Sequence, residues 1–272
     1  MPFLFLRPFA RALSLYSGGG LMYNSAIKLK RYSSMFNKAK KAPDRPFCSA
    51  VIVAGGSSSR MGEDKLAIEL GGMTVIERTL RVFQASAYCD EIVAVTRSEK
   101  IPEVAAIARE AGVTKLKCVV TGGGTRMASS RAGVRECSAA AGLIAIHDAA
   151  RPLVTEEIIS RAVRAAAERG AAAPAIHVKD TVRQARGGRV LRTLERDELF
   201  LMQTPQVFRA DLIRAALDEA VKLRLSLTDD CAAVMLLDAE VFLVEGSEEN
   251  LKLTTPADVY AAEAILEKRG EA

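Results

Sequence analysis

The feature that most constrains the fold of this chain is a regular alternation of short apolar runs with helical patterns. The apolar runs are rich in β-branched residues and occupy residues 50–54, 91–96, 116–121 and 143–147. Amphipathic segments follow near residues 74–85, 102–111, 126–139 and 155–169. Buried strands that alternate with helices predict right-handed βαβ units. We therefore expect an α/β fold with a mostly parallel, twisted sheet that is flanked by helices.

The pattern changes after Ala175. Residues 178–198 are polar and basic, with Gly187-Gly188 at their centre, and two arms around such a pair predict a β-hairpin. The hairpin has few apolar residues of its own, so we expect it to project and to lean on another surface, such as a second subunit. Further helices are expected at 211–223, at 229–237 and from Pro256, with a last strand at 241–245.

The first apolar run opens into a loop of small residues, and the segment reads AVIVAGGSSSRMGEDK over residues 50–65. Ligands of parallel sheets bind at the carboxyl ends of the strands. Backbone N–H groups of such a loop can converge on a phosphate, and Arg60 and Lys65 add positive charge. The glycine spacing fits neither GxxxxGK[ST] nor GxGxxG. Taken alone, the loop is equally compatible with a nucleotide site and with a plain turn that has a solvated basic rim.

Two further segments fall at the same edge of the predicted sheet. IHDAARPLV places Asp148 and Arg151 just past a buried strand, where the carboxylate could hold Mg²⁺ and the guanidinium could neutralise a phosphate. The alternative is that these two side chains pair with each other. In TGGGTRMASS, the loop N–H groups and Ser129 could bind a base or ribose, unless the segment is only a tight turn with Thr125 as a helix cap. His147 is expected to pack rather than to act as a base.

The hairpin and the C-terminal region supply the remaining candidates. Thr181, Arg183 and Arg196 would suit a phosphorylated second substrate, although an exposed hairpin face also explains their polarity. Lys252 lies in an extended segment before a helix, and Thr255–Asp258 form a helix start with a cap and an early proline. Residues 228–230, Thr-Asp-Asp, are likewise interpreted as a cap with first-turn acids.

The net charge of +5 belongs to the N-terminal segment rather than to the predicted folded body. Of 38 basic and 33 acidic residues, nine and one lie within residues 1–46, so the remainder is slightly acidic. A nucleic-acid-binding field over the whole protein is not supported, and no apolar stretch is long enough for a membrane span. Five cysteines without a CxxC pair indicate buried thiols in a reducing compartment.

Residues 1–46 are interpreted as a disordered basic extension without a catalytic role, and the protein is expected in the cytoplasm. The segment is rich in Lys, Arg and Ser and nearly free of acids, so a plastid transit peptide is the alternative. A start assigned too far upstream would also explain it, because Met22 and Met35 follow within the segment.

Taken together, the motifs resemble one family, the 2-C-methyl-D-erythritol 4-phosphate cytidylyltransferases of the non-mevalonate isoprenoid pathway. The pieces that carry the resemblance are AGGSSSRMGEDK, GGGTRMASS, HDAARPLV, the DT of KDTVR, LERDELFLMQTPQ, TDD and VEGSEENLKLTTPAD. They occur in the family's order over roughly residues 48–268. The resemblance implies a Rossmann-like nucleotidyltransferase fold over 47–272, with residues 178–198 as a dimerisation arm. The ribitol-5-phosphate cytidylyltransferases share much of the pattern, but HDAAR and the ER before QTPQ look more like the erythritol branch.

The resemblance implies a nucleotide site. Arg60 and Lys65 match the basic pair that holds the CTP phosphates and stabilises the transition state, and Lys252 matches a second essential lysine. The nucleotide-binding residues that the resemblance implies are Ala54, Gly55, Gly56, Ser57, Gly123, Ser129 and Asp148. The loop departs from the family in Ala54-Gly55-Gly56, where Ala-Ala-Gly is common, and in Asp64, where a proline is usual. Asp64 is expected to face solvent, because an inward carboxylate would repel a triphosphate.

The resemblance also implies a second-substrate site and a reaction. Asp148 matches a Mg²⁺-associated acid, and Arg151 matches the basic residue of the same corner. Thr181 and Arg196 match residues that bind the sugar phosphate from the hairpin of the opposite subunit. The implied reaction is transfer of CMP from CTP to methylerythritol phosphate by a homodimer that uses Mg²⁺, without nucleic acid or membrane. A ribitol-5-phosphate enzyme and a non-catalytic nucleotide-binding module are the alternatives.

Overall fold

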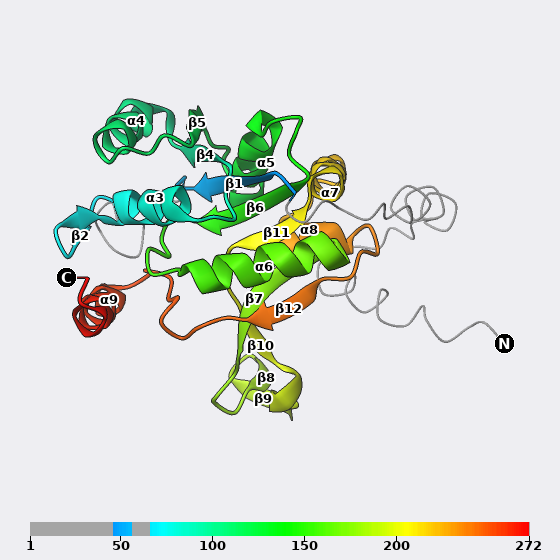
Figure 1. Ribbon diagram of the computed structural model, residues 1–272. Coiled ribbons are helices and arrows are strands. Elements are labelled where there is room, and N and C mark those ends of the chain that lie inside the picture. Colours follow the sequence, from blue (N-terminus) through cyan, green and yellow to red (C-terminus); the bar gives the residue numbers. More distant parts are fainter. Residues whose placement is uncertain (1–45, 56–65, 272) are drawn as a thin grey trace. The chain divides into compact units, whose positions relative to one another are not determined.

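The computed structural model of this chain describes residues 46–55 and 66–271. The expected basic extension, apart from Pro46, and the loop from Gly56 to Lys65 lie outside the described residues. The main sheet has the strand order β10-β7-β11-β6-β1-β4-β5, with β12 on the other edge of β7 (Figure 1). Its strands are β1 (Cys48–Val53), β4 (Glu91–Thr96), β5 (Leu116–Thr121), β6 (Leu143–Asp148), β7 (Ala171–His177), β10 (Phe200–Met202), β11 (Gln206–Arg209) and β12 (Phe242–Glu245).

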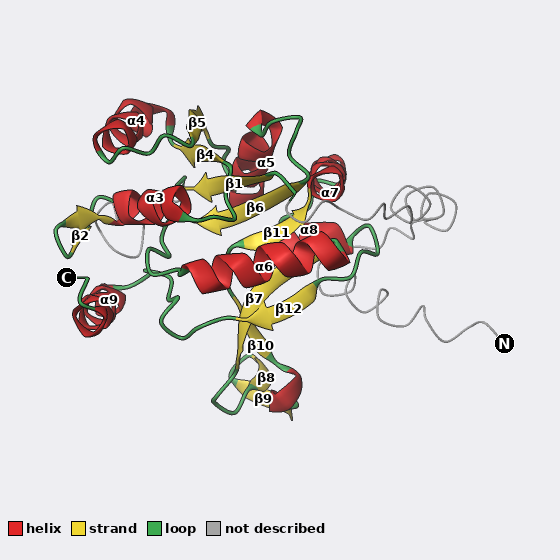
Figure 2. Cartoon of the chain, in the orientation of Figure 1, coloured by secondary structure: helices red, strands yellow, loops and turns green. Residues whose placement is uncertain are grey.

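Helices connect these strands and cover both faces of the sheet (Figure 2). They are α3 (Val75–Ala85), α4 (Ile101–Glu110), α5 (Arg126–Glu136), α6 (Glu156–Arg169), α7 (Ala210–Lys222), α8 (Asp230–Met235) and α9 (Pro256–Arg269). Short elements complete the described chain: β2 (Glu69–Leu70), β3 (Met73–Thr74), β8 (Arg183–Arg186), β9 (Arg189–Thr193), η1 (Ser98–Lys100) and η2 (Arg196–Glu198). β1, β4, β5 and β6 are parallel to one another, whereas β11 is antiparallel to β6 and β7. The prediction of a mostly parallel sheet flanked by helices is confirmed.

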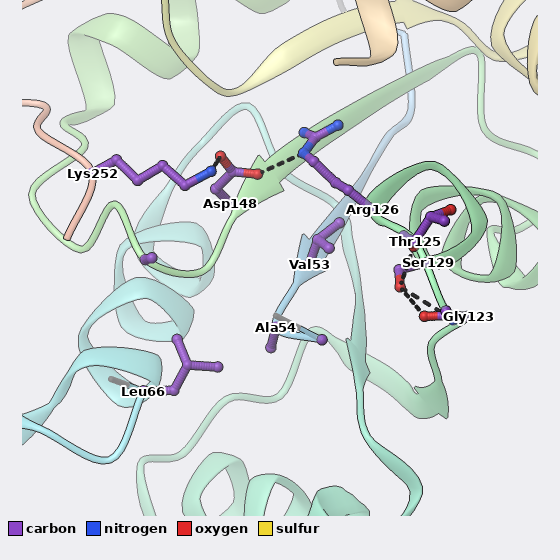
Figure 3. Close-up of a pocket in the computed structure, with 12 residues that line it drawn as sticks. Val53, Ala54, Leu66, Gly123, Thr125, Arg126, Ser129, Asp148 and Lys252 are labelled. Carbon is purple, nitrogen blue, oxygen red and sulfur yellow. Dashed lines mark hydrogen bonds and ion pairs between the residues drawn. The ribbon is translucent and has the colours of Figure 1, made fainter. Parts of the chain in front are cut away.

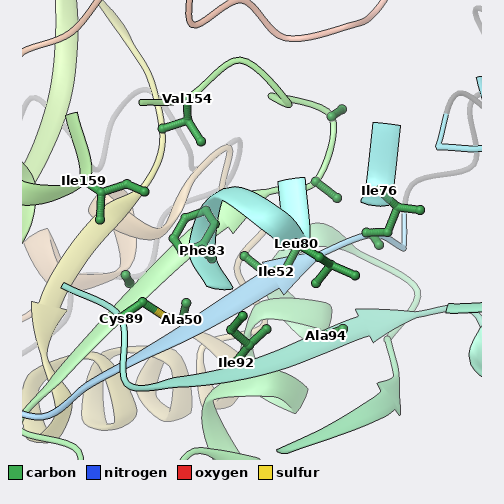
Figure 4. Packing of buried hydrophobic residues seen from close by; sticks show 14 of the residues in the cluster. Ala50, Ile52, Ile76, Leu80, Phe83, Cys89, Ile92, Ala94, Val154 and Ile159 are labelled. Atoms are coloured by element: carbon green, nitrogen blue, oxygen red, sulfur yellow. The ribbon is translucent and has the colours of Figure 1, made fainter. Parts of the chain in front are cut away.

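The central strands are apolar along their whole length because both of their faces are buried. Ala50 and Ile52 of β1 belong to a cluster that includes Phe83 of α3 (Figure 4). Val51 between them faces α5, since a Cβ atom added at Gly133 would lie 2.4 Å from its Cγ1. The glycine lets the helix backbone come close to the sheet, and the burial of a side chain as large as Phe83 stabilises the fold by about 2 kcal/mol.

Three strands of the main sheet fall where the sequence predicted none. β7 reads AAAPAIH, and alanine and proline are both uncommon in strand interiors. β10 and β11 lie on one edge of β7 but do not form a continuous strand. Met202 pairs with Ala175 and Val207 with Ala172, so that residues 203–206 lie opposite only residues 173–174 and the β10–β11 side bulges. The bulge contains Gln203–Pro205 and lies at the same edge as the carboxyl end of β6.

The predicted hairpin is confirmed as β8 and β9, which form a separate two-stranded sheet. Gly187 and Gly188 have φ values of 55° and 76°, the left-handed backbone that a tight two-residue hairpin turn requires. The hairpin projects from the end of β7 and β10 (Figure 1). Val190 and Leu191 on β9 are more than half exposed in the single chain. The expectation that the hairpin leans on another molecule stays a prediction.

Candidate functional site

A cavity of about 340 Å³ opens at the carboxyl ends of β1, β5 and β6 (Figure 3). We call it the first cavity; its described walls are the end of β1 with Gly55, the loop from Gly123 to Arg126, Asp148 and Lys252. These segments meet because β1 pairs in parallel with both β4 and β6, with Val53 opposite Asp148. The structure thus brings the strand-end candidates together, as the sheet topology predicts.

A second cavity, of about 270 Å³, adjoins the first. Its walls include Arg151, the bulge between β10 and β11, and Thr228 and Asp229 before α8. Arg126, Asp148 and Lys252 line both cavities. Two binding spaces therefore share one cluster of a carboxylate and two cations, an arrangement that can place two anionic ligands on either side of the same charges.

The floor of the first cavity is formed where two loops close around Ser129. Its hydroxyl lies 3.0 Å from the carbonyl oxygen of Thr125 and accepts a hydrogen bond from the N–H of Gly123 at 3.2 Å. A Cβ atom at Gly122 would lie 2.7 Å from that hydroxyl, and one at Gly55 would lie 3.2 Å from it. Glycines are needed here because the backbone approaches the serine so closely. Ser129 is 2% exposed and holds the loop together, a structural role in addition to the predicted contact with cytidine.

The start of α5 follows directly from its sequence. Thr125 caps the helix by accepting the N–H of Ala128 at 3.1 Å, as predicted. The cap turns the preceding glycines toward the first cavity, where the free N–H groups of a helix N-terminus favour an anion. The next residue, Arg126, enters the wall that separates the cavities.

Asp148 is held between two cations. Its Oδ1 accepts a hydrogen bond from Arg126 Nε at 3.0 Å, and its Oδ2 accepts one from Lys252 Nζ at 2.7 Å (Figure 3). Burial alone would raise the pKa of the Asp148 carboxyl, but Arg126 and Lys252 together hold that pKa well below its usual range. Burial lowers the pKa of Arg126, and Asp230 and Asp148 more than reverse that effect. Asp148 and Arg126 are therefore ionised at neutral pH.

Asp148 and Arg151 do not form the simple pair that the sequence left open. The Arg151 guanidinium donates to the carbonyl oxygen of Asn250 at 2.7 Å and to that of Met202 at 3.3 Å. It thereby joins the loop that follows β6 to the end of β10 and to the segment that carries Lys252. Arg151 Nε is buried and has no partner within the described structure, beside the second cavity.

His147 is fully buried and packs on Phe83, with ring centroids 4.9 Å apart. Its Nε2 lies 3.2 Å from the carbonyl oxygen of Arg151, which can only accept, so we assign the proton to Nε2. Nδ1 then accepts from the hydroxyl of Thr204, whose oxygen in turn accepts the N–H of Asp148. Burial lowers the pKa of His147 to about 3, and the ring is neutral. The prediction that His147 packs and positions, rather than acting as a base, agrees with this geometry.

The predicted site residues fall into three groups according to where the structure places them. Ala54, Gly55, Gly123, Ser129, Asp148 and Lys252 all line the first cavity, and Arg151 lines the second. Thr181 and Arg196 lie at the base of the hairpin and line neither cavity. Gly56, Ser57, Arg60 and Lys65 lie outside the described residues.

Sequence reasoning missed Arg126 and Asp230 as site residues. Asp230 was interpreted as a first-turn acid, yet its Oδ2 accepts from Arg126 Nη1 at 2.7 Å and its side chain is 1% exposed. Gln206 accepts the N–H groups of Asp230 and Cys231 and holds the start of α8. The sequence contained one signal for this part of the site. Arg126 directly follows the second glycine-rich loop, and a cation at that position faces the carboxyl ends of the strands.

The described residues offer a limited donor set for a metal ion. They contain no cluster of three or more His, Cys, Asp or Glu side chains that could hold one. Mg²⁺, however, binds through one or two carboxylates together with substrate phosphates. Asp148, an ionised carboxylate at the junction of the cavities, fits that mode, provided that Lys252 or Arg126 yields one oxygen. Within the described part of the chain, no helix is long and apolar enough to cross a membrane.

A mixed, mostly parallel sheet with two adjoining cavities that share a charged cluster defines an α/β protein that binds two ligands side by side at the ends of its strands. The comparison with protein families makes this more specific. The chain belongs to the 2-C-methyl-D-erythritol 4-phosphate cytidylyltransferase family, whose model matches residues 48–268. The family predicted from the motifs, and the enzyme class it implies, are confirmed.

Individual relatives support the same assignment. The chain is 41% identical over 223 residues to the 2-C-methyl-D-erythritol 4-phosphate cytidylyltransferase of Halalkalibacterium halodurans, covering 81% of this chain and 97% of the relative. It is 42% identical over 227 residues to the enzyme of the same name from Rubrobacter xylanophilus, covering 81% and 96%. The crystal structure of 4-diphosphocytidyl-2C-methyl-D-erythritol synthase from Anaerococcus prevotii matches with a TM-score of 0.74 and 31% identity, over 82% of this chain and 96% of that one.

Proposed function

We propose that this chain transfers CMP from CTP to 2-C-methyl-D-erythritol 4-phosphate, giving 4-diphosphocytidyl-2-C-methyl-D-erythritol and pyrophosphate. The family assignment supports the substrates. The observation that carries the proposal is the shared cluster of Asp148, Arg126 and Lys252 between two cavities. CTP occupies the first cavity and the polyol phosphate the second, so that the reacting groups meet at the shared wall.

The reaction is a direct displacement. A phosphate oxygen of methylerythritol phosphate attacks the α-phosphorus of CTP, the new P–O bond forms, and pyrophosphate leaves with the electrons of the broken bond. The nucleophile is already an anion, so no general base is required. His147 could not serve as one, because it is buried, neutral and bonded to Thr204 and to the Arg151 carbonyl.

Catalysis then depends on alignment and on stabilising the charge of the five-coordinate phosphorus. Lys252 has a flexible stem and a side chain that is 36% exposed, so it can turn from Asp148 to a phosphate oxygen. Arg126 adds a second positive charge, which is fixed at the same wall, and Arg60 and Lys65 are expected to contribute from the loop outside the described residues. Asp148 and the CTP phosphates would hold Mg²⁺, whose charge would neutralise further phosphate charge.

We further propose that the active unit is a homodimer. Thr181 and Arg196 lie on a projecting hairpin and line neither cavity of their own chain. Arg196 is exposed, and its guanidinium donates to the carbonyl of Lys179 at 3.3 Å. The two residues would complete the second cavity of the partner subunit by binding the phosphate of the polyol, and the exposed Val190 and Leu191 would pack on that subunit.

The test is pyrophosphate release from CTP and Mg²⁺, with methylerythritol phosphate and ribitol 5-phosphate assayed in parallel. Release with the first acceptor alone supports the proposed reaction. Release with ribitol 5-phosphate alone would retain the mechanism and change the acceptor. CTP binding without release in either assay would contradict an enzymatic role and favour a nucleotide-binding module.

A further inference from the structure

Asp230 has no part in the reaction described above, yet it is tied directly to the charged cluster. It is the first residue of α8, and its Oδ2 accepts from Arg126 Nη1 at 2.7 Å. The same guanidinium donates through Nε to Asp148 at 3.0 Å. Arg126 therefore bridges two carboxylates, one at the junction of the cavities and one behind it (Figure 3 shows the Arg126–Asp148 half).

The position of Asp230 is fixed by two elements. Its backbone N–H donates to Gln206 Oε1 at 3.0 Å, and Gln206 Nε2 donates to Asp229 Oδ2 at 2.9 Å. Asp229 caps α8 by accepting the N–H of Ala232. Strand β11 and helix α8 thus lock together around the acid. Because its side chain is also 1% exposed, Asp230 offers Arg126 a rigid anchor.

The two cations on Asp148 differ in how firmly they are held. Lys252 has a single carboxylate partner among the described hydrogen bonds, Asp148, and a side chain that is 36% exposed. Arg126 has two carboxylate partners and is 23% exposed. When a substrate phosphate enters either cavity, Lys252 can turn to it and loses only its contact with Asp148. Arg126 stays in place because Asp230 still holds it.

A buried ion pair is weak support for stability, because desolvation offsets most of the attraction. Burial raises the pKa of Asp230, and the Arg126 charge opposes that effect. The nearby Ser130 hydroxyl opposes the rise in the pKa of Asp230 as well. The contact between Asp230 and Arg126 is therefore better explained by the orientation of the guanidinium than by a gain in stability.

We propose that Asp230 is a positioning residue that fixes the Arg126 guanidinium at the wall between the two cavities, so that Asp148 keeps its orientation when Lys252 turns to a substrate phosphate. The positioning itself is a property of the ligand-free protein. Its effect on rate rests on the proposed CMP transfer.

The same helix supplies a matched control. Arg131 of α5 donates to Asp218 of α7 at 2.7 Å, again an arginine from this helix with an aspartate from the C-terminal half. The Asp218 side chain is 48% exposed, and neither residue lines a cavity. Asp230→Asn and Asp218→Asn therefore make the same chemical change on two ion pairs, of which only one touches the cluster.

The first measurement is the Nε–Hε resonance of Arg126 in the full chain without ligands, assigned by its loss in Arg126→Lys. In Asp230→Asn this resonance is expected to shift and to exchange faster with solvent, and in Asp218→Asn it is expected to stay in place. An unchanged resonance in a folded Asp230→Asn protein would overturn the proposal. Asp230→Glu, which keeps the charge, is the second variant and is expected to retain the slow exchange.

The second measurement is steady-state CMP transfer. Asp230→Asn is expected to lower kcat roughly ten- to hundredfold with little change in the KM for CTP, because a misaligned group costs rate more than binding. When Asp230→Asn is combined with Arg126→Lys, kcat should fall little further than in Arg126→Lys alone, because both substitutions remove the same contact. A purely structural Asp230 would lower the melting temperature and leave kcat unchanged. If the resonance moves but the unaltered chain releases no pyrophosphate, the proposed function fails and the positioning of Arg126 stands.

Discussion

The ammonium of Lys252 lies 2.7 Å from the carboxylate of Asp148, although 104 residues separate them in the chain. The pair forms because Leu253 donates its N–H to the carbonyl of Ala150, which draws the Lys252 segment against the β6 corner. Arg151 reinforces this approach through the Asn250 carbonyl. Each charge compensates the other in the ligand-free chain, so the lysine is kept close to the place where phosphates are expected to bind.

Removing the Lys252 charge should affect the rate more than CTP binding. Lys252→Met keeps the length of the apolar stem and is expected to lower kcat by about 10²–10³, the usual cost of one transition-state donor. The measurement is kcat and KM for CTP from pyrophosphate release. Lys268→Met is the control, because that lysine is exposed and pairs with Glu249 outside both cavities. A raised KM with unchanged kcat would show that Lys252 only binds.

Asp148→Asn should reduce both activity and stability. The amide keeps the volume of the carboxylate but leaves Arg126, Lys252 and Arg151 close together without their shared anion. Breaking a buried ion pair in this way costs about 3–5 kcal/mol, and the partly exposed lysine should bring the loss toward the lower end. Urea unfolding gives the free energy. A variant as stable as the unaltered chain would mean that the cations are adequately solvated.

The glycines of the second loop can be tested one at a time. A Cβ atom at Gly123 would lie 2.4 Å from Ala128 Cβ, whereas one at Gly124 meets nothing within 4 Å. Gly123→Ala is therefore expected to displace the loop and to raise the KM for CTP about tenfold, equivalent to about 1.4 kcal/mol. Gly124→Ala is the matched control and should bind CTP normally. Equal effects of the two substitutions would contradict a specific close approach.

Much of the fold could be predicted because its strands carry strong local signals. β4 and β5 lie at the predicted residues, and β1 and β6 differ from them by one or two residues at their ends. β7 could not be predicted, since its alanines are selected by close packing under α6 rather than by strand propensity. The β10–β11 bulge depends on pairing with a strand that was itself not expected.

The site residues can be separated in the same way, into those that local sequence patterns predict and those that only the folded structure brings together. Strand-end candidates such as Gly123 and Asp148 were predictable, because parallel topology brings the carboxyl ends together. Arg126 and Asp230 were missed because each lies in a motif that a helix cap already explained locally. Their contact spans 104 residues, and no short-range pattern contains it. Lys252 was a candidate from its place in an extended segment before a helix, the resemblance implied its role, and the structure supplies its physical partner.

Stability should fall as the solution becomes acidic, through His147. The folded chain keeps this ring neutral with a pKa of about 3, whereas in the unfolded chain it titrates near 6.5. Protons therefore bind the unfolded state first, and the stability present above pH 6.5 is lost as pH falls toward 3. The expected slope between about pH 6 and pH 4 is about 1.4 kcal/mol per pH unit from this group.

The measurement is the free energy of unfolding by urea across this pH window, in the unaltered chain and in His147→Gln. The variant removes the titrating ring, so its unfolding free energy should depend less steeply on pH by that amount. His177→Gln is the control, because it removes an exposed histidine on the last residue of β7. The same slope in His147→Gln as in the unaltered chain would show that other groups cause the acid sensitivity.

The proposed sharing of sites between subunits predicts that two inactive variants can restore each other. Arg196→Ala removes the hairpin cation, and Lys252→Met removes the lysine of the charged cluster. If Arg196 acts on the partner's cavity, a mixed dimer contains one site that lacks both groups and one that is intact. Refolding the two variants together in equal amounts should recover about a quarter of the unaltered activity, given random pairing in a symmetric dimer.

Recovery should follow dimer formation measured by light scattering. No recovery, despite mixed dimers, would place Arg196 at the site of its own chain, and an active monomer would exclude the shared site altogether.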